Sequence, residues 1–291
     1  MYHQGFFKPP GFIHDTEPGE GFYLNIKFPN LFINFLFTIL YIVYTCRLFR
    51  QWCFNLIQVF VGTSGWLYDW NEEASFDWYV KYSGLNAVEL NASFYRFPFR
   101  NQIKSWSSKG SNLRWSIKVH RSITHFHRMK KTALDIWWKF YKLFEPLDKY
   151  IDFYLFQLPP NYVCKDSNLD NISMFNKEIS LNERMAIEFR HSSCFNNRIV
   201  EWSCRNNITL VSIDAPIANW IVKSINTIYL RLHGREYWYG YEYSDKELRE
   251  IVYKTIDLNP EKIYVFFNNN HWMLENARLV MDIYRETLGV N

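Results

Sequence analysis

Short apolar segments alternate with segments of helical periodicity from residue 57 to the C-terminus, and this alternation limits the fold more than any other feature. Strands that alternate with helices form βαβ units, whose strands lie parallel in one sheet. The sequence predicts eight such strands. They are expected at Ile57–Val61, Ala87–Leu90, Arg114–Val119, Ile151–Gln157, Arg184–Glu188, Thr209–Ile213, Thr227–Arg231 and Lys262–Phe267.

Helical patterns lie between most of these strands. The clearest cover Ala133–Leu147 and Leu274–Leu288, where apolar residues recur at helical spacing. Ser244-Asp-Lys-Glu247 has the form of a capping box that opens the helix before strand eight, and Gly289 stands where a C-terminal cap belongs. The stretch Asp214–Asn226, between strands six and seven, is too short for a full helix, so one helix is expected to be reduced.

Eight strands with intervening helices predict an α/β fold of the TIM type, a (β/α)₈ barrel over residues 57–291. The chain has 291 residues, and barrels of about 250 residues routinely form one domain. A hydrophobic content of 48% excludes a disordered protein. The formal net charge of +4 permits an anionic substrate without requiring a nucleic-acid partner.

Residues 1–56 differ from the rest and are expected to be an N-terminal extension. Residues 31–46 read LFINFLFTILYIVYTC, an apolar run just short of the roughly 17 residues that a membrane helix needs. Three interpretations stay open. The run could be a membrane anchor, a helix packed on the barrel, or the translation of upstream non-coding DNA that results from a wrongly assigned start codon. The third arises because the chain is rich in residues with AT-rich codons. An anchor would leave the barrel in the cytoplasm, because Arg47 and Arg50 follow the run.

The cysteines are spread along the chain without a Cys-x-x-Cys pair. An odd number at wide spacing argues against a disulfide framework and against a structural zinc site. The pattern fits a reducing cytoplasm, which is the location we expect. The five cysteines are Cys46, Cys53, Cys164, Cys194 and Cys204.

Polar residues gather at the C-terminal ends of the predicted strands. Side chains two apart in a strand share a face, so Glu89 and Asn91 point the same way, as do Glu188 and Arg190. The other face carries apolar residues suited to packing against helices. The polar face is therefore expected to point into the barrel, at the mouth where active sites of TIM barrels lie. This inward set is Glu89, Asn91, Lys118, Gln157, Glu188, Arg190, Asp214, Arg231, His233 and Asn268.

A buried network that only plugs the barrel is the alternative to a functional pocket. Buried charges are normally paired, and the acids and bases of the inward set balance. Yet seven of the eight strands supply at least one polar group, and burying so many for stability alone is costly. We therefore favour function. The balancing groups are Glu89, Glu188 and Asp214 against Lys118, Arg190 and Arg231.

Several motifs occur in order from about Val59 to near the C-terminus. They are Gly62-Thr-Ser-Gly-Trp66 with Tyr68 and Trp70, Val88-Glu-Leu-Asn91 with Phe94-Tyr95, Lys118 with Thr124-His125, Phe156-Gln-Leu-Pro-Pro160, Ile187-Glu-Phe-Arg-His191, Arg231-Leu-His-Gly234 with Tyr239 and Tyr243, and Phe266-Phe-Asn-Asn269. Together they resemble the family called domain of unknown function 72, which implies a TIM-type barrel and supplies no reaction. Two loops depart from the family pattern: Cys194 stands where a Trp is usual, and Asn270-His-Trp-Met273 replaces a loop with glycine.

Several chemistries are open at this mouth. Glu89 and Glu188 could be the acid and base of a glycosidase, with aromatic residues stacking on a sugar. His233 could hold a metal, but no close histidine spacing supports one, and a hydrogen-bonded core histidine is the plainer interpretation. Lys118, Arg190 and Arg231 could bind a phosphate or carboxylate group of a substrate.

We predict an enzyme of the hydrolase, lyase or isomerase type, with a hydrolase favoured, that acts on a small polar or anionic molecule. No metal is expected, and the sequence does not identify a cofactor. The alternative is a non-catalytic module that binds a ligand or nucleic acid, and a membrane partner is expected only if residues 31–46 insert. The expected catalytic residues are Glu89, Lys118, Glu188, Asp214 and His233, and the expected substrate-binding residues are Trp66, Tyr68, Asn91, Tyr95, Gln157, Arg190, Arg231 and Asn268.

Overall fold

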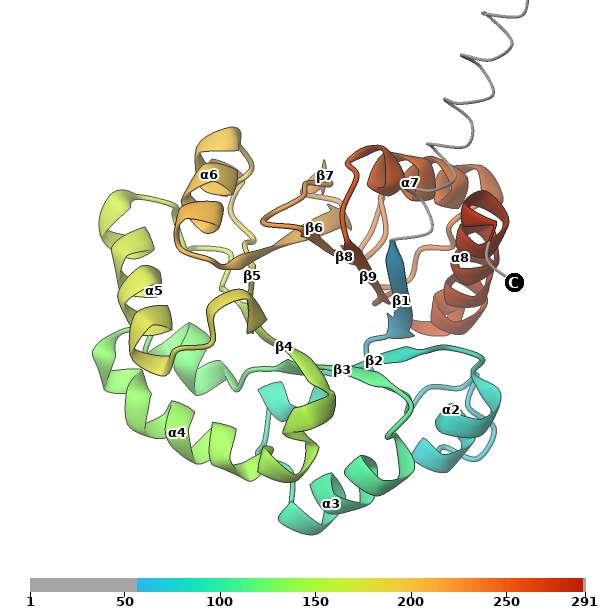
Figure 1. The fold of residues 1–291 in the computed structure, drawn as a ribbon, viewed down its shortest axis with the longest axis horizontal. Coiled ribbons are helices and arrows are strands. Elements are labelled where there is room, and N and C mark those ends of the chain that lie inside the picture. The colour runs from blue at the N-terminus through green and yellow to red at the C-terminus, as the bar shows by residue number, and fades with distance from the viewer. Residues whose placement is uncertain (1–56, 290–291) are drawn as a thin grey trace, which may run out of the picture. The chain divides into compact units, whose positions relative to one another are not determined.

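A closed ring of parallel strands, surrounded by helices, is formed by residues 57–289, which are the residues that the computed structural model describes (Figure 1). Each strand pairs in parallel with its neighbours around the ring, and the β5–β6 pairing closes it. The predicted TIM-type barrel is confirmed. The parallel strands are β1 (Gln58–Thr63), β2 (Ala87–Leu90), β3 (Arg114–Lys118), β4 (Ile151–Gln157), β5 (Met185–Glu188), β6 (Thr209–Ala215), β8 (Thr227–Leu232) and β9 (Lys262–Phe267).

The helices lie outside the ring with their apolar faces toward the strands (Figure 1). In α4, for example, Trp137 is buried and its ring centroid lies 5.2 Å from that of Tyr154 and 5.4 Å from that of Phe156, both in β4. The helices are α2 (Phe76–Tyr82), α3 (Arg100–Lys109), α4 (Leu134–Leu143), α5 (Asp166–Ile179), α6 (Asn197–Arg205), α7 (Asp245–Asp257) and α8 (Met273–Leu288).

The helix ends follow local chemistry. The capping box of Ser244 and Glu247 opens α7, and Gly289 closes α8 in the left-handed conformation, both as predicted. The expected helix over Ala133–Leu147 is instead broken, because α4 ends at Leu143 and a 3₁₀ turn over Glu145–Tyr150 follows. Pro146 explains the break, since proline lacks the N–H that an α-helix needs and clashes with the preceding turn.

The connection between β6 and β8 contains no helix. A short strand, β7 (Ala218–Trp220), turns back beside β6 and pairs with it antiparallel (Figure 1). Pro216 and Ile217 lie at the turn of this hairpin. The reduced helix expected between strands six and seven is thus replaced by a hairpin.

The inner face of β6 is the opposite of the one predicted. Val211, Ile213 and Ala215 belong to the inner apolar cluster, whereas Leu210 belongs to the outer one. Strand register agrees, because Ile213 is the partner of the inward Arg231 and Asp214 is the partner of Leu232. All seven residues of β6 are buried, so alternation of polar and apolar residues could not select a face.

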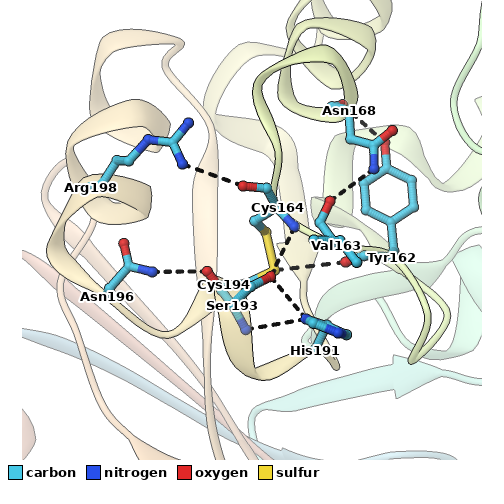
Figure 2. Close-up of a disulfide and its surroundings, with 9 residues drawn as sticks. All are labelled: Tyr162, Val163, Cys164, Asn168, His191, Ser193, Cys194, Asn196 and Arg198. Carbon is cyan, nitrogen blue, oxygen red and sulfur yellow. Dashed lines mark hydrogen bonds between the residues drawn. A yellow bond between two sulfur atoms is a disulfide. The ribbon is translucent and has the colours of Figure 1, made fainter.

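A disulfide joins Cys164, in the loop after β4, to Cys194, in the loop after β5 (Figure 2). The expectation that argued against a disulfide framework is therefore wrong for this pair. The two cysteines are 30 residues apart in sequence, but β4 and β5 are neighbours, so the loops that leave them meet and the two Cα atoms lie 5.3 Å apart. Cys204 is free and exposed.

The apolar run at residues 31–46 lies outside the described residues, so its interpretations stay predictions. Among residues 57–289, no helix is long and apolar enough to cross a membrane.

Candidate active site

Glu89, in β2, lies fully buried inside the barrel with both carboxylate oxygens occupied. Ser64 donates a hydrogen bond to Oε1 at 2.6 Å and the Tyr229 hydroxyl donates to Oε2 at 2.7 Å. Arg231 donates from Nη2 to Oε1 at 2.6 Å. Three donors therefore surround this one carboxylate.

Arg231, near the end of β8, bridges two carboxylates and is itself fully buried. Its Nη2 pairs with Glu89 and its Nη1 with Glu188, at the end of β5. Arg190 donates from Nε to the other oxygen of Glu188. Burial alone would raise the pKa of Glu188, but the two guanidinium groups outweigh it and hold that pKa well below its usual value. Two carboxylates and two guanidinium groups therefore form a neutral quartet.

His233 lies against this quartet and is fully buried. Its Nε2 lies 3.1 Å from Nη2 of Arg190 and 3.5 Å from Oε1 of Glu188, and its Nδ1 lies 3.2 Å from the side-chain amide of Asn268. Burial and the positive charges of Arg190 and Arg231 hold the pKa of His233 well below its usual value. The imidazole is therefore neutral, and its unprotonated nitrogen can accept a hydrogen bond, either at Nε2 from Arg190 or at Nδ1 from the Asn268 amide.

Lys118, at the end of β3, is buried but unpaired. Its Nζ lies 4.6 Å from the centre of the Phe94 ring and makes no hydrogen bond or ion pair with any residue in 57–289. Burial, followed by the charge of Arg231, lowers the pKa of Lys118 to about 7. A large fraction of this amine is therefore free base at neutral pH.

Asp214 is not part of the cluster, because β6 turns it to the outer face. Its carboxylate accepts hydrogen bonds from Arg235 Nε at 3.1 Å, Asn219 at 2.8 Å and the Tyr243 hydroxyl at 3.2 Å. The predicted position of Asp214 on the inner face of the barrel is therefore wrong. Its placement also changes the charge balance, since Asp214 pairs with Arg235 and leaves Lys118 without a counter-charge.

The predicted substrate-binding residues divide into two groups. Asn91 donates to the backbone oxygen of Ser64 at 3.2 Å, and the Tyr68 hydroxyl donates to the same oxygen at 3.4 Å, which places both residues beside the cluster. Gln157, at the end of β4, donates to the backbone of Leu158 at 3.3 Å. These three residues, with Asn268, Arg190 and Arg231, lie at the mouth.

The other two predicted aromatic residues differ from them. The Trp66 ring packs among Phe76, Trp106 and Trp115 between the barrel and its helices, so it serves mainly as core. Tyr95 is 66% exposed on the loop after β2. Neither ring contacts the charged quartet.

A pocket of about 160 Å³ opens between the loop after β1 and the end of β2. It is large enough for several water molecules or a small organic molecule. Its lining consists of Ser64, Gly65, Trp66, Leu67, Tyr68, Leu90, Asn91 and Ala92.

Two contributors to the site were not predicted from the sequence. Ser64 lies in the motif after β1 but was not assigned a role, although it donates directly to Glu89. Trp238 lies in the loop after β8, and its ring centre is 4.5 Å from the Arg190 guanidinium carbon and 5.3 Å from the His233 ring centre. The dense aromatic run of that loop is the one sequence signal that could have indicated it.

The described residues contain no group of three His, Cys, Asp or Glu side chains placed to hold an ion. The carboxylates of Glu89 and Glu188 pair with arginines.

A family model described as "Protein of unknown function DUF72" matches residues 60–288, which is most of the chain. The chain belongs to the DUF72 family. This confirms the resemblance that the ordered motifs indicated. A search of curated proteins gave no match.

Solved structures of DUF72 proteins share the barrel. A DUF72 protein from Thermotoga maritima has 24% identity and a TM-score of 0.66, over 80% of this chain and 99% of its own. A DUF72 protein from Enterococcus faecalis has 19% identity and a TM-score of 0.66, over 79% of this chain and 95% of its own. D-psicose 3-epimerase in the presence of D-fructose shares the fold at 10% identity and a TM-score of 0.52, over 80% and 99% of the two chains.

Proposed function

We propose that this DUF72 barrel is an enzyme that moves a proton on a small polar substrate, with the Lys118 amine as the base. One observation carries the proposal: a buried lysine without a counter-charge stands at the barrel mouth, beside a quartet that is already neutral. A base works best when its pKa lies near the working pH. Burial gives the Lys118 amine such a pKa, about 7.

The geometry favours a lyase or isomerase over the glycosidase considered from the sequence. A glycosidase needs one carboxyl group that carries a proton and another that is free to attack or to activate water. Here Glu89 accepts three hydrogen bonds, and Glu188 is held between Arg190 and Arg231. Both carboxylates are therefore engaged in holding the arginines and are not available for the two roles that a glycosidase requires. The fold shared with D-psicose 3-epimerase is compatible with an isomerase but does not determine the substrate.

We assign Asn91, Tyr68 and Asn268 to substrate binding. Arg190 and Arg231 hold the carboxylates of the quartet in place. His233 is neutral and lies within reach of Arg190, so it can accept a hydrogen bond but does not carry a positive charge. The neutral quartet leaves the polar binding groups and Lys118 to interact with the substrate.

Lys118→Gln is expected to lower proton exchange by about 10²-fold or more, because a positioned base contributes roughly 10²–10⁴-fold. The measurement is NMR of deuterium uptake from D₂O into small hydroxy-carbonyl compounds and 2-oxo acids. Lys139→Gln, which removes an exposed lysine of α4, is the matched control and should exchange like the wild type. If the Lys118 and Lys139 variants exchange at equal rates, Lys118 is not the base.

A measurement of stability distinguishes this proposal from the alternative that the buried polar network only stabilises the barrel. Removing an unpaired buried amine takes away no ion pair, so Lys118→Met should unfold at the same urea concentration as the wild type or a higher one. A marked loss of stability in Lys118→Met would support the plug.

A second candidate function is binding of nucleic acid at the rim of the barrel. Phe99 and Phe126, in loops after β2 and β3, are 75% and 69% exposed, and Arg121 lies 5.7 Å over the Phe126 ring. Exposed aromatic residues beside arginines are typical of single-strand binding. Binding that weakens steeply between two salt concentrations would favour this function, whereas binding of a small molecule in the pocket would hardly change.

We include a cytoplasmic location in the proposal, supported by the exposed free thiol of Cys204, since thiols stay reduced there. The disulfide is compatible with it because Cys164 and Cys194 are only 4% and 0% exposed, which limits attack by external thiols. Microscopy of a C-terminal fluorescent fusion tests the location.

A further inference from the structure

Lys118 differs from the other buried charged groups of residues 57–289, because no carboxylate faces its amine. Glu89 and Glu188 are near enough to influence it, but each is already bound by a guanidinium group. The Nζ atom lies over the ring of Phe94, 4.6 Å from its centre.

That ring cannot hold the amine as a permanent ammonium ion. A cation over an aromatic face gains about 0.5–2 kcal/mol, whereas burial of an unpaired ion costs several kcal/mol. Burial therefore shifts Lys118 toward the free amine, and a free amine has the lone pair that a nucleophile needs.

We propose that Lys118 forms a Schiff base with a small hydroxy-substituted aldehyde or ketone. The inference rests on the proposed function and deepens it, because it names a covalent role for the same amine and a substrate class. Lys118 lies at the end of β3, and the segment after β2 that supplies Phe94 also lines the pocket through Asn91 and Ala92.

The chemistry requires no oxidant or reductant. The nitrogen lone pair attacks the carbonyl carbon, the C=O electron pair moves to oxygen, and a proton passes from nitrogen to that oxygen. The carbinolamine then loses water as the C=N bond forms, so amine and carbonyl become imine and water. The protonated imine withdraws electrons and makes the adjacent C–H bond more acidic. Because the imine nitrogen no longer has a lone pair, the proton passes to water, and the imine takes the place of the free amine in promoting the proton transfer.

The hydroxyl group of the substrate is inferred from Asn91. Its side-chain oxygen is buried and has no hydrogen-bond partner among the described residues, while its nitrogen donates to the backbone oxygen of Ser64. That donation fixes the orientation of the amide, so the oxygen is an unsatisfied acceptor on a residue that lines the pocket. A substrate hydroxyl is the donor that would satisfy it.

Reductive trapping tests the inference. The full chain is incubated with cyanoborohydride and one of three probes: dihydroxyacetone, pyruvate or acetone. We expect one adduct per chain in the intact mass spectrum, located at Lys118 by peptide mapping, with dihydroxyacetone labelling at least about tenfold faster than acetone. Lys118→Arg should lose the adduct and Lys139→Arg should keep it. Equal labelling of surface lysines, unaffected by Lys118→Arg, would overturn the inference.

The pH dependence gives a second test that needs no variant. Labelling should rise with pH through about 7, where Lys118 loses its proton, whereas an ordinary lysine near 10.4 holds about 10³-fold less free amine at pH 7. Site-resolved labelling that rises only above pH 9 contradicts the inference. Deuterium exchange without trapping would reject the Schiff base and keep the proposed function, and the absence of both would reject the two together.

Discussion

Replacing Arg231 with methionine is expected to lower the free energy of unfolding by about 3–5 kcal/mol, because the change leaves the buried Glu89 carboxylate without a counter-charge and leaves Glu188 paired with Arg190 alone. Glu89, Glu188 and Arg231 are all fully buried, so water cannot take the place of the guanidinium group. Native domains are stable by only about 5–15 kcal/mol, so such a loss is a large share of the total. Urea unfolding followed by circular dichroism measures it.

A second variant separates the cost of the unpaired carboxylate from the loss of packing. Adding Glu89→Gln to Arg231→Met removes the charge that is left unpaired, while Glu188 keeps its pair with Arg190, so most of the lost stability should return. Arg285→Met, which breaks an exposed pair with Asp282, should change the unfolding midpoint little. If Arg231→Met is no more destabilising than Arg285→Met, the bridge does not stabilise the fold.

Replacing Cys194 with serine is expected to cost about 3–4 kcal/mol, because the disulfide closes a loop between residues 30 apart and restricts the unfolded chain. The measurement compares urea unfolding of the variant and the wild type, each with and without reductant. The variant should be insensitive to reductant, and the wild type with its disulfide reduced should match the variant.

Cys204→Ser is the control, because that thiol is free and exposed. It should unfold like the wild type. A Cys194→Ser variant as stable as the wild type under oxidising conditions would show that the cross-link does not limit the unfolded state.

The charge balance at the mouth carries the functional proposal. In the sequence, the three acids of the inward set balance its three bases, so a buried network of paired charges was an alternative to a functional pocket. The fold removes Asp214 from that set by pairing it with Arg235 outside the ring, and Lys118 is left over. Because unpaired buried groups with shifted pKa values are typical of functional sites, this imbalance favours chemistry over a plug.

The sequence by itself determined the barrel. The bounds predicted for three strands, Ala87–Leu90, Ile151–Gln157 and Lys262–Phe267, match β2, β4 and β9, because parallel strands covered on both sides are short apolar runs bounded by turn residues. Alternation also placed Glu89 and Arg231 on the inner face correctly, since each lies among apolar residues of the opposite parity.

Tertiary structure alone decided the facing of β6, the disulfide and the state of Lys118. β6 is buried on both faces, so its pattern contains no inner and outer side. Cys164 and Cys194 meet because their strands are neighbours, which cysteine spacing does not reveal. The pKa of Lys118 depends on burial and on which carboxylates are already paired, and both are properties of the assembled barrel and not of any one segment.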